Sequence, residues 1–243
     1  ISPYDPNYQD YNAVLGEPCK AHLFGTDEYG RDILSRILYG SRVSISIGIV
    51  AQIVASIVGI ALGSLAGYYG GWVDNVISRV MEIFQAFPDL IFAMAIMTFM
   101  GKGVLNLFIA LGLLTWVRTA RMIRASVMQL KEKEYIEASR ACGASTYWII
   151  MKGLVPNCLS TIIVLVTLGI PNAIMYEASL SFLGIGIQPP TPSWGNMISA
   201  AQTFISYRPV YSIMPGVAIM ITVIAFNIFG DGLRDALDPK LRG

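Results

Sequence analysis

The sequence predicts an all-α, polytopic membrane protein with five membrane spans. The chain has 243 residues, of which 54% are hydrophobic and only 14% are charged, and its mean hydropathy is +0.58. A soluble domain of this size carries about 25% charged residues. The deficit of charge, together with several apolar runs near the length of a membrane helix, indicates helices in lipid rather than one large soluble core.

Composition also excludes several classes of function. The net charge is +1, so there is no overall electrostatic signal for nucleic acid or for an acidic substrate. Cys19, Cys142 and Cys158 are too few and too scattered for a disulfide framework or a zinc site. His22 is the only histidine, which argues against a histidine-rich metal site and against Ser-His-Asp chemistry. We expect no metal site in this chain.

Residues 1–42 form a polar and aromatic N-terminal segment that we expect outside the cytoplasm. Its end predicts a short amphipathic helix with four apolar residues on one face: Ile33, Leu34, Ile37 and Leu38. Thr26 or Asp27 is the expected cap of this helix. Arg31 and Asp32 are expected to pair on the surface.

Five apolar segments then approach the length of about 20 residues that a membrane helix needs. They are Val43–Ala66, Ile77–Met100, Val104–Val117, Leu159–Leu180 and Ser212–Phe229. The second is interrupted by Pro88 and Asp89, and the third is short but can extend into Arg118 and beyond. The fourth contains Pro171 and Glu177.

Basic residues predict the orientation, because Lys and Arg favour the cytoplasmic side in short loops. With residues 1–42 outside, eleven of the 17 Lys and Arg residues fall inside. The predicted inner segments are 68–79, 118–157 and 230–243, and the last includes Lys240 and Arg242. The C-terminus is therefore expected in the cytoplasm. An odd number of spans with the N-terminal segment outside implies one more helix upstream or translocation by another route, and we expect the upstream helix.

The inner segment 118–157 is charged and amphipathic, and its pattern predicts a helix-turn-helix at the membrane surface. Its small residues share one helix face: Ala138, Ala141, Cys142 and Ser145. Gly143 is expected to close the first helix in the left-handed conformation, and Ser145 or Thr146 to cap the second. Pro156 is expected to break that second helix. The segment is either a docking surface or a hairpin lying on anionic headgroups.

A resemblance favours docking. Glu137-Ala138-Ser139, then Gly143 and later Val155-Pro156, resemble the Glu-Ala-Ala loop of membrane subunits of binding-protein-dependent ABC importers. The chain departs from that pattern in three places, which are Ser139 for Ala, Gly153 for Ile and Val155 for Leu. The spacing of the loop is intact.

Longer strings resemble the dipeptide/oligopeptide permease branch, in particular the second subunit of its permease pair. They are Phe24–Arg36, Leu180–Gly195 and Phe226–Pro239. The resemblance covers nearly the whole chain. It implies the transmembrane domain of a type I ABC importer over residues 43–243, with six spans in the full subunit. It also implies a bacterial inner-membrane location.

The resemblance assigns the loop to docking on an ATPase partner, as a coupling helix. The residues implied are Glu137, Ala138, Ser139, Arg140, Ala141, Gly143, Ala144 and Ser145. The chain has no phosphate-binding loop of the Gly-x-x-x-x-Gly-Lys-Ser/Thr type, so ATP and Mg²⁺ are expected on two partner ATPase subunits and no cofactor on this chain. The other expected partners are a second, related permease subunit, an extracytoplasmic solute-binding protein and membrane lipids.

Candidates for the pathway are Pro171, Asn172 and Glu177, because ionisable groups and broken helices within spans are functional by default. We expect α-helix to break at Pro171. The alternative for Glu177 is a carboxylate that holds the turn at 180–186. The residues expected to face the solute-binding protein are Gln188, Pro189, Pro190 and Trp194.

The function expected is import of di- or oligopeptides by a permease subunit, not by an enzyme. Within the same architecture, nickel chelates or another small solute remain as alternatives. A polytopic membrane enzyme is disfavoured because the sequence lacks Gly-x-Ser-x-Gly and His-Glu-x-x-His motifs. An ion channel is disfavoured because no filter signature is present.

Overall fold

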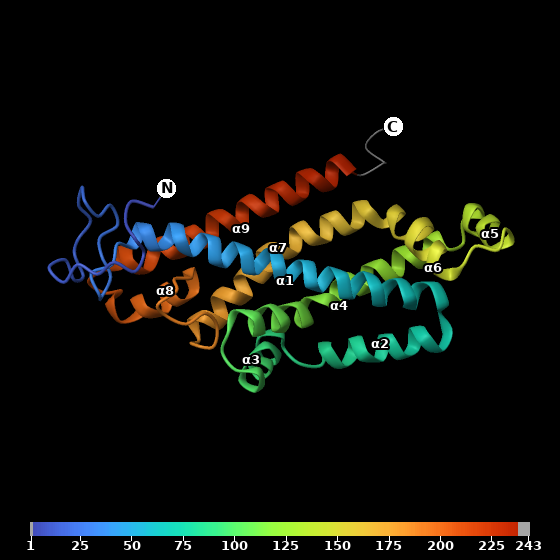
Figure 1. The fold of residues 1–243 in the computed structure, drawn as a ribbon, viewed down its shortest axis with the longest axis horizontal. Coiled ribbons are helices and arrows are strands. Elements are labelled where there is room, and N and C mark those ends of the chain that lie inside the picture. Colours follow the sequence, from blue (N-terminus) through green and yellow to red (C-terminus); the bar gives the residue numbers. More distant parts are fainter. Residues whose placement is uncertain (1, 238–243) are drawn as a thin grey trace.

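The computed structural model describes residues 2–237 and shows an elongated bundle of long helices (Figure 1). Four helical segments in that range are long and apolar enough to cross a membrane: Ile33–Tyr69 (α1), Val104–Leu130 (α4), Thr146–Phe182 and Pro209–Leu237 (α9). Gly71–Gln85 (α2) and Asp89–Met100 (α3) form a bent pair that gives a fifth span if the two are counted together. The predicted all-α membrane fold is confirmed. Lys240 and Arg242, used for the predicted orientation, lie outside the described residues.

α1 joins two segments that the sequence suggested were separate. The expected short helix after residue 32 runs without a break into the first span, so α1 is 37 residues long. Asp32 caps it, since its carboxylate accepts a hydrogen bond from the Ser35 N–H at 2.7 Å. The expected caps were wrong because the Asp27 carboxylate is already engaged by Arg31 at 2.6 Å.

The second predicted span is bent, not straight. α2 ends at Gln85, α3 begins at Asp89, and the two helices meet at 90°. Pro88 explains the break because the residue before a proline, here Phe87, is disfavoured in helical conformation. Asp89 then lies in the first turn of α3, where a negative charge favours the helix N-terminus.

Pro156 does not break the second helix of the loop, contrary to the prediction. Thr146–Trp148 (α6) continues as a π-helical turn, Ile149–Leu154, then a 3₁₀ turn, Pro156–Cys158, and then α7, Leu159–Phe182. The Val155 N–H donates to the Ile150 carbonyl at 2.9 Å, which is the wider π spacing. The Gly153 carbonyl accepts from the Asn157 side chain at 2.6 Å. The widened turn thus accommodates a residue that has no N–H.

Glycines allow α1 to pack closely against α4. Gly59, Gly63 and Gly67 recur every fourth residue and all face α4. A Cβ atom at Gly63 would lie 2.4 Å from the Ala120 carbonyl oxygen, and one at Gly67 would lie 2.7 Å from that of Arg124. The two backbones therefore approach more closely than any side chain on this face of α1 permits.

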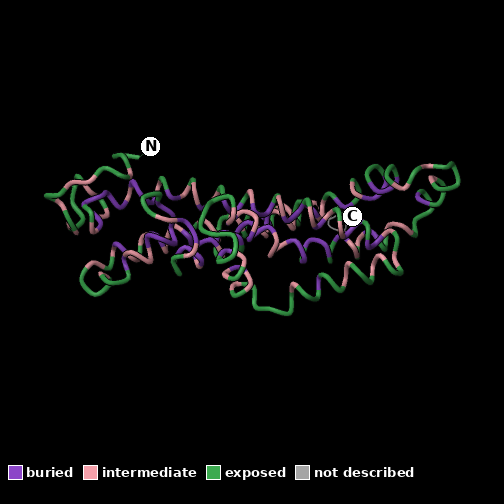
Figure 2. Tube along the Cα trace, turned by 60° about the horizontal axis from the view of Figure 1, so that its bottom comes forward, coloured by how far each residue is buried: buried purple, intermediate pink, exposed green. Residues whose placement is uncertain are grey.

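The bundle has two distinct ends (Figure 1). Glu134–Ala141 (α5) and α6 lie at one end, while the N-terminal segment and Trp194–Ala201 (α8) lie at the other. Figure 2 shows buried backbone along the middle of the long helices, and mostly exposed backbone along α2 and around α5. Any partner that contacts α5 is therefore separated from one at α8 by the length of the bundle.

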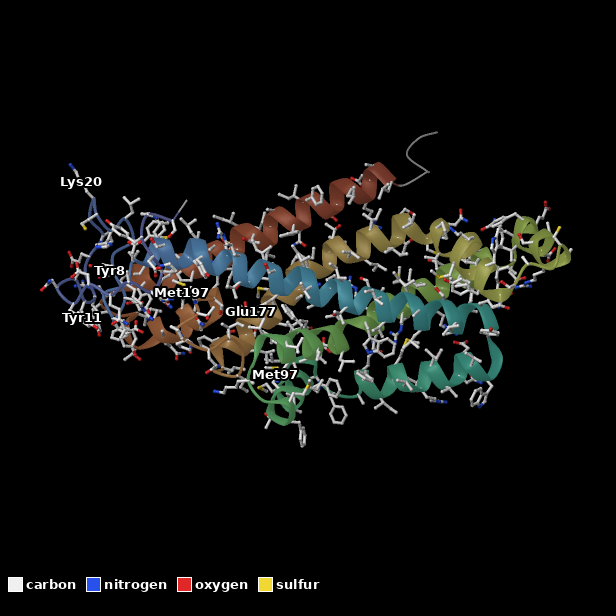
Figure 3. All side chains as sticks on the ribbon, in the orientation of Figure 1. Tyr8, Tyr11, Lys20, Met97, Glu177 and Met197 are labelled. Carbon is white, nitrogen blue, oxygen red and sulfur yellow. The ribbon has the colours of Figure 1, made fainter. Side chains whose placement is uncertain are left out.

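The N-terminal segment is folded onto the ends of α1 and α9. The Arg208 Nε donates to the Leu15 carbonyl at 2.8 Å, and the Tyr211 hydroxyl donates to the Glu28 carboxylate at 2.5 Å. Arg31 and Asp32 are buried, so the expectation that they pair on the surface was wrong. The side chains of the segment that point outward include those labelled in Figure 3 at this end, Tyr8, Tyr11 and Lys20.

Candidate functional site

The predicted docking segment forms the helix-turn-helix that its sequence indicated. α5 ends at Ala141, and Gly143 has φ +78°, the left-handed conformation that glycine adopts most easily. Ser145 caps α6, since its hydroxyl accepts from the Trp148 N–H at 3.3 Å. Local turn chemistry therefore accounts for the whole motif.

None of the eight predicted docking residues is buried by the described chain. Six are exposed and two are half-buried (Ser139 and Ala144); the six are Glu137, Ala138, Arg140, Ala141, Gly143 and Ser145. Small side chains at four of these exposed positions leave the backbone there accessible to a close approach: Ala138, Ala141, Gly143 and Ser145. The segment therefore offers a compact, uncovered surface at one end of the bundle.

α5 is anchored to two membrane helices through one apolar residue. Ile136 is fully buried and belongs to a cluster with residues of α4 and of the 146–182 helix, namely Ile123, Val127, Ile149 and Leu154. The Arg140 guanidinium also lies over the Tyr68 ring of α1, 5.1 Å from its centroid. α5 therefore contacts α1, α4 and the 146–182 helix.

Gly153 stands where the pattern that the loop resembles has isoleucine. Its lack of a side chain leaves space for the buried Ile136 side chain. A Cβ atom at Gly153 would lie 2.9 Å from the Ile136 Cδ1 atom. The Tyr135 hydroxyl donates to the Gly153 carbonyl at 3.3 Å, so α5 contacts the π-helical turn at its backbone. In this chain the large apolar side chain at this contact is therefore Ile136 of α5, and it packs against the glycine at position 153.

A cavity of about 410 Å³ lies between α1, α4, α7 and the bend from α2 to α3. Asn172, one of the predicted pathway residues, lines it, and so do three charged residues that the prediction did not include: Asp89, Arg118 and Arg121. Arg118 was visible in the sequence only as the end of a short span. Within residues 2–237, no group of three or more His, Cys, Asp or Glu side chains is placed to hold a metal ion.

Glu177, which is labelled in Figure 3, is absent from the lining of this cavity. Its carboxylate is fully buried and accepts hydrogen bonds from the Ser44 hydroxyl at 2.9 Å and the Ser181 hydroxyl at 2.7 Å. The Ser181 oxygen in turn accepts from the Ile187 N–H at 2.9 Å. The structure supports the alternative in which Glu177 holds the turn after α7. Pro171 is also buried, and α7 continues through it without the expected break.

Of the residues expected to face a solute-binding protein, Trp194 does not. It is 2% exposed, and its indole N–H donates to the Ile37 carbonyl at 3.2 Å, because Trp194 begins α8 against α1. Pro189 and Pro190 are exposed and Gln188 is half-buried. The two prolines border a hollow of about 460 Å³ that residues of the N-terminal segment also line.

Comparison with known sequences matches residues 59–243 to a family described as the binding-protein-dependent transport system inner membrane component. The chain is 43% identical over 244 residues to the glutathione transport system permease protein GsiD of Escherichia coli O6:K15:H31, covering all of this chain and 80% of the relative. It is 43% identical over 243 residues to GsiD of Pectobacterium atrosepticum, again over its full length and 81% of the relative.

Solved structures give the same architecture. The inward-facing MetNI methionine ABC transporter aligns with a TM-score of 0.67 at 20% identity, over 83% of this chain and 96% of the other. The crystal structure of an amino acid ABC transporter with histidines aligns with a TM-score of 0.63 at 14% identity, over 83% and 94%. At these identities the likeness shows the fold alone.

Proposed function

This chain belongs to the family of binding-protein-dependent transport system inner membrane components, and we propose that it forms half of the pathway of a peptide importer. It is a multi-pass permease subunit of an ABC importer of the inner membrane, and its relatives are permeases rather than enzymes. The observation that supports the mechanism is the uncovered α5–α6 segment, anchored in the bundle at the end opposite α8.

In this proposal α5 and α6 dock on a cytoplasmic ATPase subunit, and ATP and Mg²⁺ bind only to such partners. Ile136 joins α5 to α4 and to the 146–182 helix, so closure of the ATPase pair moves both helices. ATP and the loaded binding protein each shift the pathway between inward- and outward-facing states only if they bind one state more tightly.

The assembly that we propose contains a second, related permease subunit, two ATPase subunits and an extracytoplasmic solute-binding protein that docks at the N-terminal segment and Gln188–Pro190. The solute is a di- or oligopeptide. Two findings support this class: the strings that resemble the peptide-permease branch, and relatives whose name specifies glutathione, itself a small peptide.

Native cysteines test the proposed orientation. Cys19 is exposed on the N-terminal segment, Cys142 is exposed beside α5, and Cys158 is buried. We expect a membrane-impermeant maleimide to label Cys19 from outside intact spheroplasts and Cys142 only in inverted vesicles. Mass spectrometry of the labelled peptides reads the result, and Cys142→Ser and Cys19→Ser variants control for assignment. Labelling of Cys142 from outside would reverse the orientation.

A charge reversal tests the docking role. Glu137→Arg should reduce co-purification of the ATPase subunits with the tagged permease in mild detergent by about tenfold or more, because it replaces an exposed carboxylate of the proposed docking surface with a long cation. Glu132→Arg, the same change in the linker before α5, serves as the matched control and should retain them. Equal recovery with Glu137→Arg and the parent protein would remove the docking assignment.

A further inference from the structure

A mostly apolar groove lies between α1 and the start of the 146–182 helix, next to the docking segment. Its volume is about 350 Å³, and none of the described residues that line it is charged. Residues 60–69 of α1 contribute one wall, and residues 146–155 contribute the other. Leu65 and Met151, from opposite walls, are both exposed, so the groove is open at the surface of the chain.

The length of the groove matches one leaflet of a membrane. α1 ends, and the 146–182 helix begins, at the α5 end of the bundle (Figure 1). Tyr69 and Tyr147 therefore mark that end of the groove, while Ile60 and Val155 mark its deep end. Helix residues 60–69 rise about 14 Å at about 1.5 Å per residue. Half of a hydrocarbon core of about 30 Å is about 15 Å.

Exposed aromatic residues mark the α5 end of the groove. Tyr69 and Tyr147 line it and are 56% and 75% exposed, and Trp72, in the first turn of α2, is 78% exposed. Tyr and Trp are enriched where hydrocarbon meets the lipid headgroups, because their rings are apolar and their O–H or N–H groups bind water. This end of the groove is therefore at headgroup level, and the deep end lies among acyl chains.

A cation lies at the same end. The Arg140 guanidinium is exposed and lies over the ring of Tyr68, 5.1 Å from its centroid, and Tyr68 directly precedes Tyr69 in α1. Guanidinium groups form strong, charge-assisted hydrogen bonds with phosphate. The groove is thus apolar over the length of one chain and ends beside aromatic rings and a positive charge, which is the pattern that a phospholipid complements.

We propose that this groove binds one acyl chain of a phospholipid in the leaflet on the α5 side, which the proposed orientation makes the cytoplasmic leaflet. The chain lies between Leu65 and Met151, and its methyl end points toward Ile60 and Val155. The phosphate lies at the level of the Arg140 guanidinium. Because α6 forms part of one wall and α1 forms the other, the lipid packs between the docking segment and the longest helix of the bundle.

Photo-crosslinking to the permease–ATPase complex, extracted in mild detergent so that bulk lipid is removed, tests this assignment. The probe is phosphatidylglycerol with a diazirine at the methyl end of one chain. Peptide mass spectrometry should place the cross-link within residues 60–65 or 150–155. A second probe, with the diazirine beside the glycerol, should move the cross-link to Tyr69 and Tyr147.

Substitutions that fill the groove should displace the lipid. Met151→Trp should lower the cross-linked fraction about fivefold or more, because the indole takes the space of the chain. Leu65→Trp acts from the opposite wall and should have the same effect, so the test does not depend on the folding of one variant. Met128→Trp is the matched control, at an exposed methionine of α4 that does not line the groove, and should cross-link as the parent complex does.

The proposal is overturned if the parent complex retains no lipid in the groove, if both probes label the same residues, or if Met128→Trp lowers cross-linking as much as Met151→Trp. A benzophenone side chain at position 151 that cross-links with a partner subunit would also overturn it, because protein would then occupy the groove. None of these measurements depends on transport, so a negative result would leave the proposed importer function unchanged.

Discussion

Gly143→Pro is expected to abolish ATP-driven uptake by the reconstituted transporter, while Gly143→Asn retains most of it. Proline cannot adopt the φ of +78° seen here, and it lacks the N–H that donates to the Arg140 carbonyl at 2.9 Å. The turn between α5 and α6 would have to change direction. Asparagine tolerates the left-handed conformation and keeps the N–H.

The difference between the proline and asparagine variants does not arise from a steric clash of the new side chain, because no heavy atom lies within 4 Å of a Cβ atom built at Gly143. Gly143→Ala should fall between the two, since the left-handed conformation costs an alanine about 1 kcal/mol. Gly216→Ala is the control at a glycine of α9 that is equally open. Solute uptake and ATP hydrolysis are measured together in proteoliposomes. Normal uptake by Gly143→Pro would show that the turn does not couple the two.

Gly63→Leu is expected to prevent assembly of the helix bundle. A Cβ atom at this position would lie 2.4 Å from the Ala120 carbonyl oxygen and 3.0 Å from its Cα, so backbone and not a flexible side chain blocks it. Overpacking a core costs about 1–3 kcal/mol where neighbours can adjust, and more is expected where α1 and α4 would have to separate. The amount of monodisperse protein after detergent extraction, and its thermal unfolding midpoint, measure the effect.

The control for this change lies two residues away on the same helix. Ala61→Leu adds the same side chain on the exposed face of α1 and should extract and unfold as the parent protein does. A Gly63→Leu variant that matched Ala61→Leu would show that close contact between α1 and α4 is not needed for the fold.

Local features were predictable from the sequence. The spans follow from apolar length, and the turn at Gly143 and the cap at Ser145 follow from backbone chemistry within a few residues. Predictions failed where a local rule met tertiary context. Pro156 was expected to end a helix, but the wide π-helical turn before it accommodates the missing N–H.

The candidate site residues likewise divide into those that local sequence could identify and those whose positions depend on tertiary contacts. The eight docking residues could be listed from the loop alone, and none of them is buried. Trp194 was expected to face the solute-binding protein and Glu177 was a candidate for the pathway, and both are buried. Asp89 was noted as an interruption of a span and Arg118 as the end of another, yet nothing in their neighbours in sequence indicated that they line one cavity.

The sequence by itself determined that the chain is a helical membrane protein and where its α5–α6 turn lies, because apolar length, loop charge and turn residues act over a few positions. The permease role was indicated by the resemblance of its loop and longer strings to a known family. Only the tertiary structure decided which polar groups meet inside the bundle. Ser44 donates to Glu177 across 133 positions, and Tyr176 donates to Asp89 across 87. Such contacts depend on how the helices pack, since burial of a polar group is favourable only where the fold brings its partner.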